Sequence, residues 1–168
     1  MVDAPGRGQA RFPPDRVPEV RDDIAEAIRL IDDPGARAVS GLACGGDLLF
    51  ADEWLKTARR LQAYLPRHVD EFLEESVRFA GEEWVDLFHE VAQNPEVSVV
   101  GPDDDMLRSH DPHSLNAHRM IEAARHEATE IHGLFLWDGL GGDGPGGTQD
   151  VISSLLEAGG SVTILRPL

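Results

Sequence analysis

Residues 36–49 read ARAVSGLACGGDLL, in which two apolar runs are joined by a turn that contains Gly45 and Gly46. The first run, residues 36–42, is short and apolar, which predicts a buried β-strand. Glycine allows a tight turn, and Asp47 is a residue type that caps helix N-termini, so a helix is expected from there to about residue 61. The stretch predicts a strand that turns directly into a helix, the building unit of α/β folds.

The rest of the chain alternates in the same way. Short apolar runs predict further strands at residues 61–66, 97–100, 131–137 and 162–165. Apolar residues at helical spacing predict helices at residues 17–31, 71–93 with a break near Gly81, 114–130 and 148–158. Such an alternation of strands and helices favours a parallel sheet.

We therefore expect an α/β fold: a Rossmann-like, doubly wound, mostly parallel sheet of about five or six strands with helices on both faces. The chain carries no internal repeat and no interdomain linker, so residues 1–168 are expected to form one domain. Residues 1–15 contain three prolines and are expected to form an N-terminal loop.

The composition is that of a folded domain without a membrane span. Apolar residues make up 41% of the 168 residues and charged residues 27%, within the normal range for globular proteins. No stretch approaches the roughly 18 apolar residues that a membrane helix needs, and the N-terminal residues lack the apolar core of a signal peptide. The single cysteine, Cys44, cannot form an intramolecular disulfide and fits a reducing compartment. These features predict a cytoplasmic protein that does not contact membranes.

The net charge of −16 narrows the range of ligands. Nucleic acids and anionic lipids are bound mainly by Lys and Arg that neutralise phosphates, so a surface this acidic excludes them as expected partners. A small anion needs only one or two arginines and a few backbone N–H groups, and it remains compatible with this charge.

Residues 137–148 read WDGLGGDGPGGT and form a second glycine-rich turn between a predicted strand and a predicted helix. Thr148 is expected to cap that helix, and the amides of Gly146 and Gly147 are expected to cradle a phosphate. Asp138, at the carboxyl end of the strand, is expected to accept hydrogen bonds from a sugar or a base. Ligands of parallel α/β sheets bind outside the carboxyl ends of the strands, and both turns are expected at that edge.

The candidate ligand-binding residues come from these two turns and from the N-terminal loop. They are Ser40, Gly41, Cys44, Gly45, Gly46, Asp47, Asp138, Gly139, Gly144, Gly146, Gly147, Thr148, Arg7 and Arg11. Plainer interpretations stand beside this one: the turns can simply join strand to helix, the two arginines can be solvated, and Cys44 can be a small buried residue. The histidines at 110, 113 and 118 do not have the spacing of a closed zinc site, so no metal is expected.

Two stretches resemble known families. The stretch SGLACGGDLLFAD, residues 40–52, resembles a motif of the DNA-processing protein A family, and GDGPGGT, residues 142–148, resembles the PGGxGT loop of the Lonely Guy phosphoribohydrolases. Both families belong to the SLOG superfamily of Rossmann-like nucleotide-binding domains, and the two motifs follow each other here in the superfamily's order. The resemblance covers about residues 16–168. It implies a nucleotide-type ligand, is compatible with a homodimer, and implies a link to an effector protein in bacterial signalling.

The sequence also departs from these families. The phosphoribohydrolases carry a catalytic Glu three residues after the loop threonine, where this chain has Val151; Asp150 is one residue early. Their catalytic Arg has only Arg119 and Arg125 as candidates. Residues 1–14 resemble the loop that follows the first strand in SLOG-type sensor domains, so a first strand is expected to be missing upstream. The resulting position in the sheet would then be unfilled or filled by a partner.

Three functions are compatible with these residues. The first is a sensor module that binds a nucleotide or a nucleotide-derived small molecule at the two glycine-rich loops without converting it. The second is an enzyme that cleaves a nucleotide N-glycosidic bond, with Asp138, Asp150 or Glu122 as the carboxylate. The third is an interaction domain that has lost its ligand. Two carboxylates and an arginine in one pocket would favour the enzyme.

Overall fold

The computed structural model describes residues 1–4, 8, 10–140 and 147–167. Helices and strands alternate along it. The helices are α1 (Val17–Arg29), α2 (Gly46–Leu55), α3 (Val69–Ser76), α4 (Glu82–Ala92), α5 (Asp104–Arg108), α6 (Pro112–Glu127) and α7 (Thr148–Glu157), with 3₁₀ turns η1 (Pro14–Arg16) and η2 (Arg78–Ala80). The strands are β1 (Ala38–Ser40), β2 (Leu61–Tyr64), β3 (Val97–Val100), β4 (His132–Leu136) and β5 (Ser161–Leu165). The protein is a mixed α/β protein, as the sequence predicts.

The strands form two parallel sheets. One has the order β1-β2-β3, and the other pairs β4 with β5, with Leu136 opposite Leu165. The prediction of one sheet of about five or six strands is therefore wrong: the described residues hold five strands, divided between two sheets. The N-terminal segment lies between the carboxyl ends of β1 and β4, because the Val2 N–H donates to the Cys44 carbonyl and Arg11 bonds Asp138.

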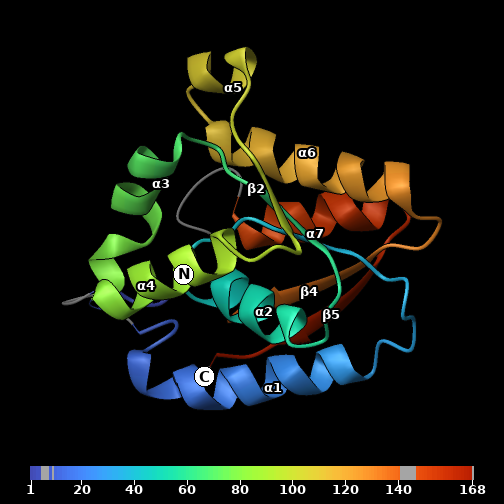
Figure 1. The fold of residues 1–168 in the computed structure, drawn as a ribbon, viewed down its shortest axis with the longest axis horizontal. Coiled ribbons are helices and arrows are strands. Elements are labelled where there is room, and N and C mark those ends of the chain that lie inside the picture. The colour runs from blue at the N-terminus through green and yellow to red at the C-terminus, as the bar shows by residue number, and fades with distance from the viewer. Residues whose placement is uncertain (5–7, 9, 141–146, 168) are drawn as a thin grey trace.

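Helices cover the strands from both sides. Figure 1 shows α6 near the top, α7 above β4 and β5, and α1 below these strands. Helix α7 contacts β4 and β5, α6 contacts β1, and α1 contacts both α2 and β5. Because each connection between parallel strands returns along a helix, the helices α2, α6 and α7 begin at the edge where the strands end.

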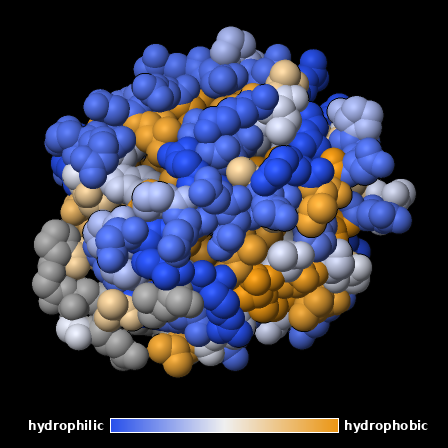
Figure 2. All heavy atoms as spheres, turned by 90° about the horizontal axis from the view of Figure 1, so that it is seen from below, coloured by the Kyte–Doolittle hydropathy of each residue, from blue (hydrophilic) through white to orange (hydrophobic). Residues whose placement is uncertain are grey.

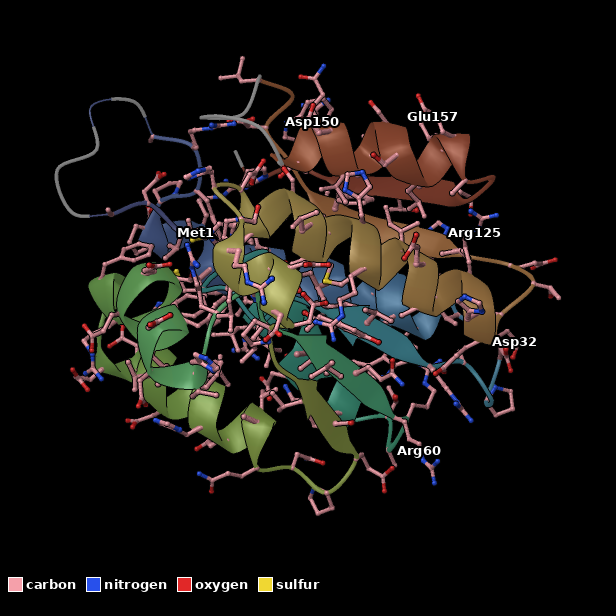
Figure 3. The ribbon with its side chains drawn as sticks, turned by 90° about the horizontal axis from the view of Figure 1, so that it is seen from above. Met1, Asp32, Arg60, Arg125, Asp150 and Glu157 are labelled. Carbon is pink, nitrogen blue, oxygen red and sulfur yellow. The ribbon has the colours of Figure 1, made fainter. Side chains whose placement is uncertain are left out.

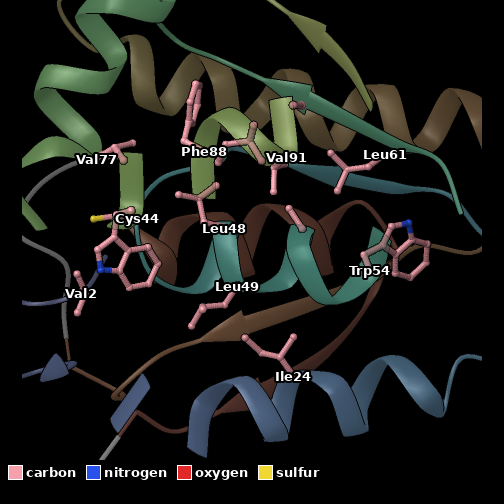
Figure 4. Close-up of a cluster of buried hydrophobic side chains, with 14 of the residues drawn as sticks. Val2, Ile24, Cys44, Leu48, Leu49, Trp54, Leu61, Val77, Phe88 and Val91 are labelled. Atoms are coloured by element: carbon pink, nitrogen blue, oxygen red, sulfur yellow. The ribbon is translucent and has the colours of Figure 1, made fainter. Parts of the chain in front are cut away.

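The main core lies between α1, α2 and α4 (Figure 4). Val20, Ile24 and Ile28 are buried at the four-residue spacing that predicts the apolar face of α1. Trp54 is also buried, and its indole N–H donates to the Arg60 carbonyl at 3.0 Å. Leu136 and Leu165 pack against the same core, so one apolar cluster connects the two sheets.

Several helix ends differ from prediction. Helix α2 starts at Gly46 with Gly45 in the N-cap position, and α7 starts at Thr148 with Gly147 there, so neither Asp47 nor Thr148 is the cap. Helix α2 also ends at Leu55, before residue 61. The break near Gly81 is confirmed: this residue has φ +122° and precedes α4. Helix α5 lies within residues 101–111, where the sequence predicts only a loop.

The surface is largely hydrophilic in the view from below, with several apolar areas between the hydrophilic side chains (Figure 2). Large apolar side chains that reach solvent include Leu30, Leu156 and Ile164. Scattered exposed apolar side chains are normal for a folded domain. In the part of the chain that the structure describes, no helix combines the length and the apolar character needed to cross a membrane.

Ion pairs join α1 to α2. Arg21 bonds Asp52 and also bonds Glu53 at 2.8 Å, and Lys56 bonds Glu53 at 2.6 Å. Burial raises the pKa of Glu53, but the hydrogen bonds from Lys56 and Arg21 outweigh it and hold the pKa below its ordinary value. The ionised carboxylate therefore stabilises the packing of the two helices.

We expect Glu53→Gln to lower the free energy of unfolding by about 1 kcal/mol at pH 7. A carboxyl group whose pKa is lowered by folding stabilises the native state above its unfolded pKa of about 4.3, and this contribution is lost as the pH falls through the folded pKa. Urea unfolding at pH 7 and below pH 4 measures the difference, with the exposed Glu71→Gln as the matched control. If Glu53→Gln lowered the free energy of unfolding equally at both pH values, the result would contradict a role for the ionised carboxylate.

Candidate functional site

The carboxyl ends of β1 and β4 meet. A methyl group on Gly46, the first residue of α2, would lie 3.1 Å from the Cβ atom of Leu136, the last residue of β4. The loop after β1 and the end of β4 are therefore in direct contact although the two strands belong to different sheets. We call this region, with the first turns of α2 and α7, the carboxyl edge. It is the place where open α/β sheets bind ligands.

Ser40, Gly41 and Asp47 form one cluster at this edge. The Ser40 hydroxyl donates to the Asp47 carbonyl at 3.3 Å and accepts the Leu42 N–H at 3.4 Å. A methyl group on Gly41 would lie 2.9 Å from the Asp47 Oδ2 atom, so the glycine makes room for this carboxylate. The Ala43 N–H donates to the same oxygen at 3.4 Å.

Asp47 is the exposed acid of this cluster. Burial of its carboxyl group raises its pKa, although the N-terminal amine and the hydrogen bond from the Ala43 N–H oppose this rise. A carboxylate in the first turn of a helix occupies the place that a bound anion would otherwise take. The first glycine-rich turn is therefore suited to groups that donate hydrogen bonds, such as sugar hydroxyls and amines, rather than to a phosphate.

Gly45 and Cys44 have structural roles. Gly45 has φ +107°, and a methyl group there would lie 2.8 Å from the Val2 nitrogen, so the N-terminal segment requires a glycine. The Cys44 thiol is fully buried beside Val77 (Figure 4). Its N–H donates to the Ser76 carbonyl at 3.0 Å, and burial raises the pKa of the thiol to about 11. Cys44 is thus a small buried residue, and neither its thiol nor its N–H faces a ligand.

Asp138 is held by Arg11. The Arg11 Nε and Nη2 atoms donate to the two carboxylate oxygens at 2.5 and 3.0 Å, and the Leu140 N–H donates to one of them at 2.9 Å. The hydrogen bond from Arg11 lowers the pKa of Asp138, although burial opposes it. Asp138 therefore orders the start of the second loop, and Arg11 is not merely a solvated side chain.

The N-terminal loop is closed by Asp3. One carboxylate oxygen accepts the Arg11 N–H at 2.8 Å and the Phe12 N–H at 2.9 Å, while the Asp3 N–H donates to the Phe12 carbonyl at 2.8 Å. Val2 and Phe12, at the two ends of this loop, are both buried. These contacts place Arg11 at the carboxyl edge.

Arg166 is a residue of this edge that the sequence motifs do not single out. It follows β5 directly, is exposed, and lies so close to Gly139 that a methyl group on that glycine would overlap its guanidinium group. Gly139 has φ +84°, which also favours glycine. The signal in the sequence is a basic residue immediately after the last predicted strand.

The rest of the second loop is described only in part. Gly147 precedes α7, and its carbonyl accepts the N–H groups of Asp150 and Val151. Thr148 opens the helix and no side chain caps it. Arg7, Gly144 and Gly146 lie outside the described residues, so their roles remain predictions.

Helix α6 packs close to the first glycine-rich turn, near Gly41. Asn116 is buried, and its amide nitrogen donates to the Tyr64 carbonyl at 2.8 Å. The sulfur of Met120 would lie 4.0 Å from a methyl group on Gly41. Arg119 donates to the Gly101 carbonyl at 2.8 Å and lies over the Tyr64 ring, 5.3 Å from its centre. Asn116 stands four residues before Met120, so helical spacing is the signal that could have drawn attention to it.

A cleft of about 140 Å³ lies between α6 and α7. Its lining residues are Ser114, Ala117, His118, Ile121, Asp150, Val151 and Ser154. Among these described residues Asp150 is the one carboxylate, and none is an arginine. Val151, on α7, supplies an apolar wall. The described lining of the cleft therefore does not include the two carboxylates and the arginine that would favour an N-glycosidic hydrolase.

We expect Asp138→Asn and Arg11→Gln each to destabilise the protein by about 1–3 kcal/mol, because each leaves a partly buried polar group without its charged partner. The double variant is expected to cost clearly less than the sum of the two, with a coupling energy of about 1 kcal/mol or more. Urea unfolding of all four proteins measures the coupling. Additive losses would mean that the pair contributes nothing as a pair.

Within the described residues, no three His, Cys, Asp or Glu side chains gather as a set that could hold a metal ion. The site is thus defined by its carboxylates, arginines and helix N-termini. Comparison with known proteins adds no name to it: no protein-family model, no curated protein and no solved structure matches this chain.

Proposed function

We propose that this protein binds a nucleotide or a nucleotide-derived small molecule at the carboxyl edge and acts as a sensor module. The observation that carries the proposal is the contact between Gly46 and Leu136. It brings the turn with Asp47 next to the loop that starts at Asp138, so that groups from both glycine-rich turns can reach one ligand.

The chemistry of the two turns is complementary to the two ends of a nucleotide. Asp47 offers an exposed carboxylate, which accepts hydrogen bonds from sugar hydroxyls or amino groups. Arg166 offers an exposed guanidinium group beside the start of the second loop, which suits a phosphate. A nucleotide carries both kinds of group on one small molecule.

Binding without conversion is favoured over hydrolysis. Asp138 is engaged by Arg11 and Leu140, Asp150 is the one carboxylate of the α6–α7 cleft, and Glu122 is exposed and does not line that cleft. No pair of carboxylates is thus arranged as an acid and a base among the described residues. Under this proposal an effector protein supplies the output, as the SLOG resemblance implies.

A thermal-shift screen tests the proposal. We expect mononucleotides, dinucleotides, cyclic nucleotides or ADP-ribose to raise the melting temperature, since a ligand at 100 times its Kd adds about 2.7 kcal/mol to the free energy of unfolding. Asp47→Asn is expected to reduce the shift, and Asp86→Asn, an exposed acid on α4, serves as its matched control.

Chromatography of each mixture after the screen decides between the alternatives. Recovery of intact ligand supports the sensor, whereas release of a free base would make the protein a hydrolase. A folded sample that shows no shift with any of these compounds would contradict nucleotide binding and favour the interaction domain.

A further inference from the structure

The carboxyl ends of β4 and β5 bring two guanidinium groups together. The Trp137 N–H donates to the Leu165 carbonyl at 2.9 Å, so the two chain segments that follow β4 and β5 lie side by side, and Arg166 reaches Gly139. Arg11 reaches the same place through its bonds to Asp138. The two arginines stand here beside Asp138 and Asp3, whose carboxylate accepts the Arg11 N–H. An arginine that lies against a loop can hold a small anion even in a protein whose net charge is −16.

The backbone at Gly139 is shaped around Arg166. Any side chain at this position would occupy the space of the guanidinium group, and the positive φ of +84° already disfavours other residues. Arg166 therefore lies directly against the first residues of the second glycine-rich loop, although it is exposed and could extend into water. The glycine and the arginine fit each other.

The charges of the two arginines are not equivalent. Arg11 neutralises Asp138 through a two-point ion pair, so this carboxylate does not repel an approaching anion. Arg166 has no ion pair with any described residue. A guanidinium group presents a planar fork of N–H donors that matches two oxygens of a phosphate. Arg166 is thus the cation of this edge that can bind a ligand.

We propose that Arg166 binds the phosphate group of the ligand, with Gly139 providing its place and the Arg11–Asp138 pair positioning the loop beside it. This inference rests on the proposed function and makes it more specific. The ligand is then a phosphorylated compound, and its phosphate lies at the ends of β4 and β5, while its hydroxyl or amino groups lie toward Asp47.

Titration calorimetry with AMP, adenosine and pyrophosphate tests this assignment. We expect the wild-type protein to bind AMP about tenfold to a hundredfold more tightly than adenosine, the difference expected for charge-assisted hydrogen bonds. Arg166→Gln is expected to remove most of that difference by weakening AMP binding alone. Arg166→Lys should be intermediate, because it keeps the charge and loses the fork.

Two further variants separate binding from folding. Gly139→Ala should weaken AMP binding like Arg166→Gln, because the added methyl group displaces the guanidinium group while Arg166 itself is retained. Arg60→Gln is the matched control: Arg60 is exposed and precedes β2, at the opposite edge of its sheet (Figure 3). It should leave the affinities for AMP, adenosine and pyrophosphate unchanged. The melting temperature of each variant shows whether it is folded.

The three compounds distinguish failure of this inference from failure of the proposed function. If adenosine and AMP bind equally and Arg166→Gln changes neither, the Arg166 assignment is overturned and nucleotide binding stands. A second outcome is that pyrophosphate binds and needs Arg166, that AMP binds no more tightly than pyrophosphate, and that adenosine does not bind. The phosphate site would then stand, and the nucleotide proposal would be overturned. If none of the three binds to folded protein, both are overturned.

Discussion

The close approach of Gly46 to Leu136 is the constraint on which the rest of the structure depends. The two sheets share no backbone ladder among the described residues, so packing at this contact helps to set their relative position, and it leaves little room for a Cβ atom on Gly46. Protein interiors transmit small changes in volume because they are closely packed. A larger residue at position 46 would therefore move the end of β4 away from the turn after β1 and separate the two halves of the site.

The two halves have opposite chemical character. On the side of β1, Asp47 presents a carboxylate that the glycine at position 41 accommodates. On the side of β4 and β5, the acid Asp138 is neutralised from within the chain and Arg166 supplies an exposed cation. A uniformly acidic surface would repel a phosphorylated ligand from every direction. Separating acid from base along one edge gives such a ligand a preferred orientation.

The local elements could be predicted from the sequence, because they depend on spacing within a few residues. Strand β3 starts and ends where the apolar run 97–100 does, and α1 starts at the predicted Val17. The caps of α2 and α7 are each displaced by one or two residues, since the cap position depends on backbone angles at Gly45 and Gly147 rather than on residue type. The number of sheets could not be predicted, because it depends on contacts between distant strands.

The candidate site, too, could be predicted from the sequence only in part. Asp47 and Asp138 could be placed at the carboxyl edge because each adjoins a predicted strand or turn. That Arg11 would engage Asp138, 127 residues away, could not be predicted from local patterns. The place of Arg166 directly after the last predicted strand is visible in the sequence, but its closeness to Gly139, 27 residues earlier, is not, because it depends on the fold.

The burial of Cys44 makes its thiol a probe of local unfolding. Its thiol lies beneath the N-terminal segment, whose Val2 bonds the Cys44 carbonyl, and its raised pKa keeps it protonated and unreactive in the native state. A thiol reagent can modify it only after the N-terminal segment or the adjacent end of α3 has opened. Since the chain contains one cysteine, a single labelling rate would report how often either of these two elements opens.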